Sequence, residues 1–141
     1  MSSLHDFVLR PRPAIPEPPA PAADAPDFRT MDAIRLALEA ELEGDERTLV
    51  AGIDVGDGGN VFGLTRGLRD RFGDRVRDTP ISEATIVGMA VGAALAGKRP
   101  VVEVMFIDFI TLAMDQLVNH AAKLRYMSGG LLSVPLVIRA Q

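Results

Sequence analysis

The sequence contains no cysteine and only two histidines in 141 residues. The absence of cysteine excludes disulfide bonds, thiolate nucleophiles and cysteine-ligated metals, and makes the cytoplasm the expected compartment. His5 and His120 have no neighbouring ligand at metal spacing, and two isolated histidines give no basis for a Ser-His-Asp arrangement. The sequence therefore offers no metal site or nucleophile of the common kinds.

Basic residues and long apolar runs are also scarce. The 15 Lys and Arg are outnumbered by 19 Asp and Glu, which gives a net charge of −4 and no basic stripe for nucleic acid. The apolar segment 82–96 is too short to span a membrane, and segment 107–127 contains Asp108, Asp115, Lys123 and Arg125. We therefore expect neither a nucleic-acid partner nor a membrane span.

Proline is concentrated near the N-terminus, where residues 1–28 contain seven of the ten prolines. Residues 10–27 combine seven Pro with five Ala, so they have few amide donors and little apolar side chain to bury. This composition predicts a disordered arm or linker over 1–28, extended and semi-rigid, and a single folded domain over 29–141.

From Arg29 onward, segments with helical and strand-like patterns alternate. The predicted helices cover 31–43, 64–72, 82–96 and 107–127, and the predicted strands cover 48–53, a short stretch from 76, 100–105 and 133–139. Strands separated by helices imply crossovers, so we expect an α/β fold with a parallel sheet and helices on both faces. The chain ends at Gln141, directly after a predicted strand, which favours a truncated domain or a subunit that a partner completes.

The predicted helix at 82–96 carries the most informative pattern. Glu83 lies in its first turn, where the helix dipole and free amides stabilise a carboxylate. Each glycine inside a helix lowers helix stability by about 1 kcal/mol relative to Ala. A stripe of small residues with two such glycines therefore needs a compensating interaction, and close packing against another backbone would provide it. We expect the stripe to face a second helix, in this chain or across a subunit interface; its members are Ala84, Gly88, Gly92 and Ala96.

The same helix begins a motif that extends along the chain. Glu83, Gly88 and Gly92 fit the pattern E-x4-G-Φ-x-x-G, and three longer runs accompany it: DTPISE at 78–83, VGAALAG at 91–97 and MDQLVNHAAKLRYMSGG at 114–130. Together they resemble the pyrimidine-binding domain of the beta subunits of thiamine diphosphate-dependent 2-oxo acid dehydrogenases. The run Tyr126–Gly130 is more similar to the pyruvate and acetoin members than to the branched-chain ones.

The resemblance implies roles for individual residues. Glu83 would be the catalytic carboxyl group that hydrogen-bonds the pyrimidine ring of the cofactor. Phe109 matches a stacked aromatic, although an ordinary core aromatic would show the same local pattern, and Ile81 and Met105 would line the ring. Leu136 matches a position whose backbone carbonyl helps to bind potassium.

The resemblance also implies partners. Gly56–Asp57–Gly58 begins like the cofactor's metal motif, but no Asn follows at the required spacing, so the segment is interpreted as a turn. Magnesium and the diphosphate would then be held by the alpha subunit of an alpha2beta2 heterotetramer, and the acyl group would pass to a lipoyl-bearing acyltransferase. On this interpretation the chain alone is inactive.

One departure from the family pattern leaves alternatives open. Ile53 stands where the family usually has an acidic residue of a polar network. A non-catalytic assembly module that keeps the fold is therefore one alternative, and a transketolase-type enzyme is another. The main expectation is oxidative decarboxylation of a pyruvate-like 2-oxo acid, and the sequence does not identify which acid.

Overall fold

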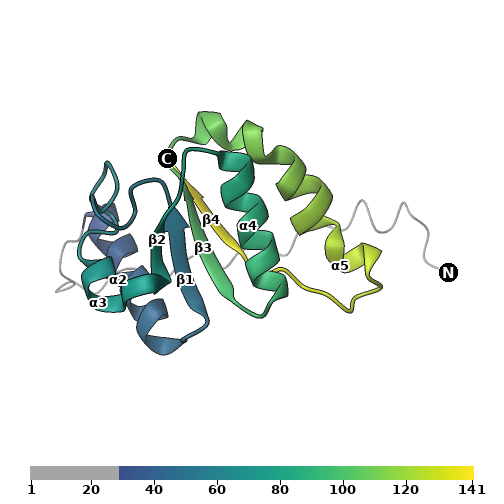
Figure 1. Ribbon diagram of the computed structural model, residues 1–141, viewed down its shortest axis with the longest axis horizontal. Coiled ribbons are helices and arrows are strands. Elements are labelled where there is room, and N and C mark those ends of the chain that lie inside the picture. The colour runs from purple at the N-terminus through teal and green to yellow at the C-terminus, as the bar shows by residue number, and fades with distance from the viewer. Residues whose placement is uncertain (1–28) are drawn as a thin grey trace, which may run out of the picture.

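The molecule is built on a four-stranded parallel sheet. The structure, a computed structural model, describes residues 29–141, and the expectations for residues 1–28 lie outside this range. The strand order is β2-β1-β3-β4, and every neighbouring pair is parallel. The strands are β1 (Thr48–Gly52), β2 (Val76–Asp78), β3 (Arg99–Val104) and β4 (Val137–Ala140) (Figure 1).

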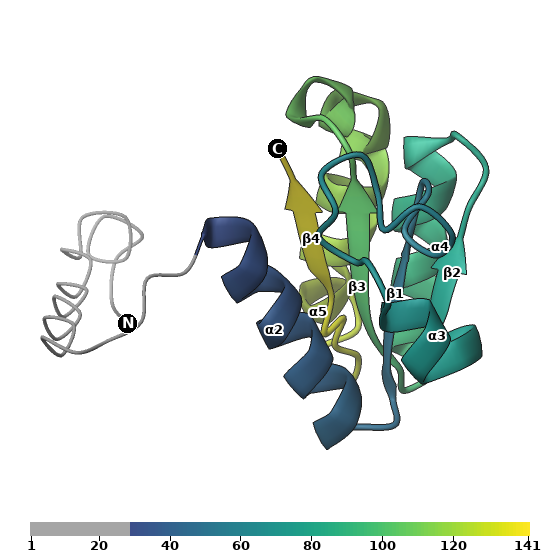
Figure 2. The ribbon, with the colours of Figure 1, turned by 90° about the vertical axis from the view of Figure 1, so that its left-hand side faces the viewer.

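Helices cover both faces of this sheet, as the sequence predicts. The helices α2 and α3 lie on one face, and α4 lies with η2, η3 and α5 on the other (Figure 2). Their bounds are α2 (Thr30–Gly44), α3 (Leu68–Phe72), η1 (Gly73–Arg75), α4 (Glu83–Leu95), η2 (Ile107–Ala113), η3 (Gln116–Ala122) and α5 (Leu124–Met127). No helix within residues 29–141 has both the length and the apolar character that a membrane crossing requires.

The core follows from the two-residue period of the strands. Val50 of β1 pairs in register with Val101 of β3, and both side chains pack on the α2 and α3 side. Their neighbours Ala51 and Val102 point to the α4 side and pack against Ile86. Because successive side chains alternate between faces, one short apolar strand supplies two separate cores.

The predicted helix over 107–127 is wrong as a single element. The segment consists of a 3-10 helix (η2), a π-helix (η3) and one turn of α-helix (α5). Ile107, Ile110 and Thr111 are β-branched and crowd an α-helical turn, and the Thr111 hydroxyl donates to the Asp108 carbonyl at 3.1 Å. Apolar periodicity alone does not distinguish these three helix types.

Two predicted boundaries also shift. The helix predicted from residue 64 begins at Leu68, because Gly67 adopts a left-handed conformation with φ of 77° that interrupts a right-handed helix. The strand predicted from residue 133 begins at Val137, because Pro135 lacks an amide donor and the Leu136 amide donates to the Val134 carbonyl at 2.9 Å. Both shifts come from backbone geometry rather than from hydrophobicity.

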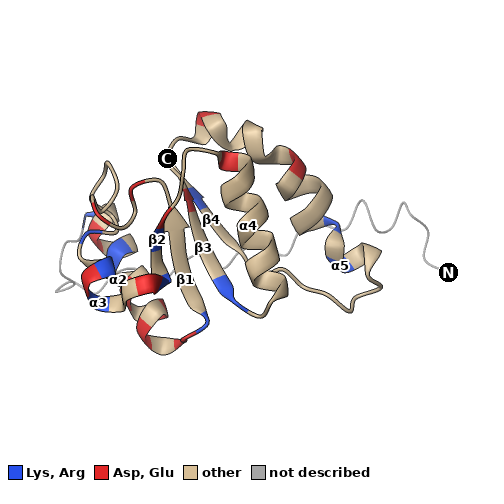
Figure 3. Ribbon diagram, in the orientation of Figure 1, with Lys and Arg blue, Asp and Glu red and all other residues tan. Residues whose placement is uncertain are grey.

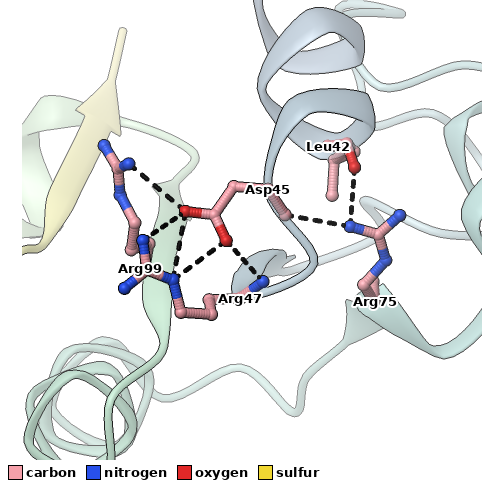
Figure 4. Close-up of polar contacts among 5 residues, drawn as sticks. All are labelled: Leu42, Asp45, Arg47, Arg75 and Arg99. Carbon is pink, nitrogen blue, oxygen red and sulfur yellow. Dashed lines mark hydrogen bonds and ion pairs between the residues drawn. The ribbon is translucent and has the colours of Figure 1, made fainter.

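Hydrogen bonds and ion pairs stabilise the connection between α2 and β1, here called the Asp45 junction, at the amino ends of the strands (Figure 4). Arg47 donates to the Asp45 carboxylate at 2.7 Å, and Arg99 of β3 approaches the same carboxylate at 3.4 Å. Hydrogen bonds from Arg47 hold the pKa of Asp45 below its ordinary value. Arg75 donates to the Leu42 carbonyl at 2.7 Å, which satisfies an acceptor in the last turn of α2.

Candidate functional site

The carboxyl ends of the strands gather at one edge of the sheet, opposite the Asp45 junction. Residues 53–60 follow β1 there, residues 79–82 lead from β2 into α4, and residues 105–106 lead from β3 into η2 (Figure 1). The Ile107 amide donates to the Gln141 carbonyl at 2.6 Å, which joins the start of η2 to the end of β4. Ligands of parallel α/β sheets bind at this edge, so the predicted site residues are assessed there.

Glu83 is the first residue of α4 and is only 7% exposed. Ser82 occupies the N-cap position, but its hydroxyl lies 2.8 Å from the Thr85 hydroxyl and does not cap the helix. Among residues 29–141, no side chain forms a hydrogen bond or ion pair with the Glu83 carboxyl group. The Glu83 oxygens are not among the fully buried polar atoms that lack a partner in the described residues, namely the hydroxyls of Thr48, Thr65 and Thr79, so a partner from outside these residues can reach them.

The predicted ring-lining residues lie near the same edge, and the described chain does not enclose them. Phe109 is 47% exposed and packs edge-to-face against Phe106, with ring centroids 6.3 Å apart. Ile81 is 80% exposed, and Met105 is half-buried. Within residues 29–141, Phe109 is therefore not enclosed as a core aromatic would be, and its stacking role stays a prediction.

Sequence reasoning missed a buried polar network on the α2 side of β3. Glu103 is 3% exposed, and its carboxylate accepts two hydrogen bonds from other segments. The Arg139 Nε of β4 lies 2.7 Å from one carboxylate oxygen, and the Asn60 side-chain amide nitrogen lies 2.5 Å from the other. A second bond links the Arg139 Nη2 to Glu103. The one local signal was a carboxylate inside the otherwise apolar run VVEVM, since alternation places Glu103 on the face that α2 and α3 cover.

The glycine-rich loop after β1 is a turn, as the sequence predicts. The Gly56 amide donates to Asp78 at 2.7 Å, while Asp57 is 87% exposed and pairs with Arg69 at 2.8 Å. Ile53 packs on the α4 side against the cluster that contains Ala51 and Ile86, so an acidic side chain there would lie beside apolar groups. Within the described residues, no three His, Asp or Glu side chains form a group that could hold a metal ion.

Leu136 lies just before β4 and packs its side chain into the two clusters on the α4 side. It also lines an apolar groove of about 450 Å³ that includes Ile34 and Val137 but none of Glu83, Ile81, Met105 or Phe109. Nothing in this surrounding shows a second potassium ligand, so the role of the Leu136 carbonyl stays a prediction.

The helical segment η3 carries the remaining polar candidates on its surface. Asn119 donates to Asp115 at 2.8 Å and Lys123 donates to Asn119 at 2.7 Å, as expected for a solvated helix face. The exposed His120 lies 3.7 Å from Asp115. These residues pair with one another and form no hydrogen bond or ion pair with Glu83.

The small-residue stripe of α4 faces another helical segment of the described chain at Gly88. A Cβ added at Gly88 would lie 3.2 Å from the Gln116 side chain of η3, whereas one added at Gly92 would meet nothing within 4 Å. The predicted second helix is therefore η3 at Gly88. The contact at Gly92 stays a prediction.

Comparison with known proteins agrees with this arrangement. The family described as "Transketolase, pyrimidine binding domain" matches residues 27–141. The 2-oxoisovalerate dehydrogenase subunit beta of Bacillus subtilis is 49% identical over 111 residues, which are 78% of this chain and 34% of that protein.

Two further relatives carry different substrate names. The acetoin:2,6-dichlorophenolindophenol oxidoreductase subunit beta of Cupriavidus necator is 45% identical over 118 residues, covering 77% of this chain and 35% of that protein. The mitochondrial pyruvate dehydrogenase E1 component subunit beta of Bos taurus is 47% identical over 121 residues, covering 85% of this chain and 33% of that protein. The chain thus spans about a third of the length of the curated relatives it matches.

Proposed function

We propose, because this chain belongs to the transketolase pyrimidine-binding domain family, that it is the pyrimidine-binding part of a thiamine diphosphate-dependent 2-oxo acid dehydrogenase. The reaction would be the oxidative decarboxylation of a 2-oxo acid with acyl transfer to a lipoyl group. The names of two relatives, the beta subunits of a 2-oxoisovalerate and a pyruvate dehydrogenase, support this proposal.

The observation that carries the proposal is the Glu83 side chain at the amino end of α4, which is 7% exposed and whose carboxyl group has no hydrogen-bond partner among residues 29–141. A planar ring nitrogen placed against this group would supply the missing hydrogen-bond partner. The fit is chemical: a carboxyl group can donate or accept a hydrogen bond, so Glu83 in the first turn of α4 can share a proton with a ring nitrogen.

When bound, thiamine diphosphate supplies a nucleophilic carbon that attacks the 2-oxo group and an electron sink for the loss of carbon dioxide. The role proposed for Glu83 is to hold a proton at the pyrimidine nitrogen and to return it. Phe109 would stack on the ring, while Ile81 and Met105 would exclude water from its edges. We also propose that the Leu136 carbonyl contributes to a potassium site, as the family resemblance implies.

The proposal includes a partner. Magnesium and the diphosphate would be held by an alpha subunit in an alpha2beta2 heterotetramer, since the described residues offer no metal-binding group. The charged residues gather over α2, α3 and the strand ends, whereas the half formed by α4 and η2–α5 is largely uncharged (Figure 3). That half exposes large apolar side chains suited to a subunit interface, among them Leu112, Tyr126, Met127 and Leu131.

The substrate and compartment belong to the same proposal. The similar identities to 2-oxoisovalerate, acetoin and pyruvate enzymes do not separate these substrates, and the motif at Tyr126–Gly130 favours a pyruvate-like acid. We propose a cytoplasmic location, as the sequence suggests; fractionation of the source cells tests it, because the Bos taurus relative is named as mitochondrial.

Replacing Glu83 tests the proposal. In the full-length subunit co-purified with its alpha partner, Glu83→Gln should lower kcat by about 10²–10⁴-fold, because an amide of similar size cannot exchange the proton. Binding of thiamine diphosphate, measured by titration calorimetry with magnesium, should persist.

Glu46→Gln is the matched control, because Glu46 is an exposed carboxylate at the opposite end of the strands. It should leave turnover unchanged. Turnover of Glu83→Gln at the wild-type rate would remove Glu83 from catalysis. A wild-type complex that assembles without any turnover would instead favour the non-catalytic assembly module.

A further inference from the structure

We infer that three polar side chains, two of them buried and the third partly buried, position the aromatic rings of the candidate site. The polar set, called here the Glu103 network, comprises Asn60, Glu103 and Arg139. The rings, called here the aromatic row, are Phe62, Phe106 and Phe109. This inference rests on the proposed function, because it assigns the aromatic row a role in binding the cofactor ring.

The network begins with a carboxylate that the fold keeps inside the protein. Glu103 is 3% exposed on β3, and donors from two other segments reach its oxygens: Arg139 of β4 and Asn60 of the loop after β1. Its neighbour across the sheet is Gly52, where a Cβ would lie 2.7 Å from the Glu103 Cβ. A charge in this layer is tolerated only with such partners and such space.

Asn60 connects Glu103 to the loop after β1. It is 5% exposed and holds a left-handed backbone with φ of 58°, which a non-glycine residue adopts at a cost. While its Nδ2 donates to Glu103, its Oδ1 accepts the Phe62 amide at 2.7 Å. The side chain of Asn60 therefore bridges the sheet to the backbone that carries the first aromatic ring.

The aromatic row continues the chain of contacts toward the proposed cofactor site. The Phe62 and Phe106 rings are edge-to-face with centroids 6.0 Å apart, and the Phe106 and Phe109 rings repeat this geometry at 6.3 Å. Phe106 and Phe109 are 41% and 47% exposed, so contacts along the row are part of what restrains their rings. Displacement of Phe62 would release Phe106 and then Phe109.

This geometry gives Glu103 a positioning role and not a catalytic one. Both of its oxygens already accept hydrogen bonds from Arg139 or Asn60, whereas the Glu83 carboxyl group has no such partner among the described residues. Well-packed apolar residues would often stabilise a buried layer as well as an ion pair does. Because the Glu103 network is connected to the loop after β1 and to the aromatic row, it has a function beyond stability.

Asn60→Gly isolates this role, because glycine keeps the left-handed backbone and removes both side-chain hydrogen bonds. The full-length subunit is used with its alpha partner, and thiamine diphosphate binding is measured by calorimetry with magnesium. We expect roughly tenfold weaker binding, the effect of losing a hydrogen bond to a charged group, with a smaller change in kcat at saturating cofactor. Hydrogen exchange at the Phe62 amide should also become faster.

Phe106→Leu breaks the aromatic row without touching the Glu103 network and should weaken binding similarly. The double variant should bind no more than about threefold more weakly than the poorer single variant, because both changes act through the same rings. Asp45→Asn, in the cluster at the opposite ends of the strands, is the control and should leave binding unchanged.

Wild-type cofactor affinity in Asn60→Gly, or fully additive effects in the double variant, would overturn the positioning inference alone. A wild-type complex that does not bind thiamine diphosphate would instead overturn the proposed function.

Discussion

At the scale of single residues, Gly52 shows how a backbone position constrains the sheet. An added Cβ would lie 2.7 Å from the Glu103 Cβ and 2.8 Å from the Glu103 carbonyl oxygen. The oxygen belongs to the backbone of β3 and cannot move aside without disturbing the ladder between β1 and β3. Gly52 is therefore required by close approach and not by its own conformation.

Gly52→Ala should destabilise the protein by about 2–4 kcal/mol, because over-packing at backbone contacts has no cheap relaxation. Urea unfolding followed by circular dichroism measures this change. Gly44→Ala is the matched control, since a Cβ there meets nothing within 4 Å, and it should be neutral or slightly stabilising. Equal stability of the two variants would contradict the close approach of β1 and β3.

At the scale of elements, the junction between α2 and β1 predicts a response to acid. Hydrogen bonds from Arg47 lower the pKa of Asp45, so ionised Asp45 stabilises the folded state more than the unfolded one. This contribution is fully present above the unfolded pKa of about 3.9 and is lost as the pH falls below it.

Below about pH 4, the melting temperature of Asp45→Asn should therefore fall less steeply with decreasing pH than that of the wild type. Between pH 5 and 8, the difference in melting temperature between the two proteins should be nearly constant. Thermal melts over this range are the measurement. Asp74→Asn, an exposed aspartate of η1, is the control. The prediction fails if the difference in melting temperature between wild type and Asp45→Asn is the same at pH 3 and pH 7.

The elements also show which features the sequence could predict. Alternating strands and helices correctly gave the α/β layers, because burial on both faces of a parallel sheet leaves a strong hydrophobic pattern. The change from 3-10 to π geometry across 107–122 left no such pattern, since it depends on local crowding and tertiary contacts. Glycine conformations such as that of Gly67 were equally hidden, because glycine also occurs within helices.

At the scale of the whole molecule, the sequence predicted some residues of the candidate site and did not predict others. Glu83 could be predicted because its motif is continuous in sequence. The Glu103 network could not, because its partners lie 43 and 36 residues from Glu103 and only the sheet brings them together. Local patterns predict residues of one helix, whereas contacts between strands require the fold.

Folding and assembly can be separated at Gly92, which has open space where a Cβ would lie. Gly92→Ala should stabilise the folded chain by about 0.5–1 kcal/mol, because alanine is the better helix former. If the stripe meets a backbone of another subunit, the same change should weaken assembly, measured by analytical ultracentrifugation with the alpha partner. A variant that is stabilised and assembles normally would contradict an interface at Gly92.

The parallel arrangement of all four strands has a last consequence for how this protein can vary. The cluster of Asp45 and its arginines lies at one rim of the sheet, and the candidate residue Glu83 lies at the other. Substitutions at the second rim therefore need not weaken the contacts at the first. Such a scaffold can diversify its reactions while its architecture stays the same.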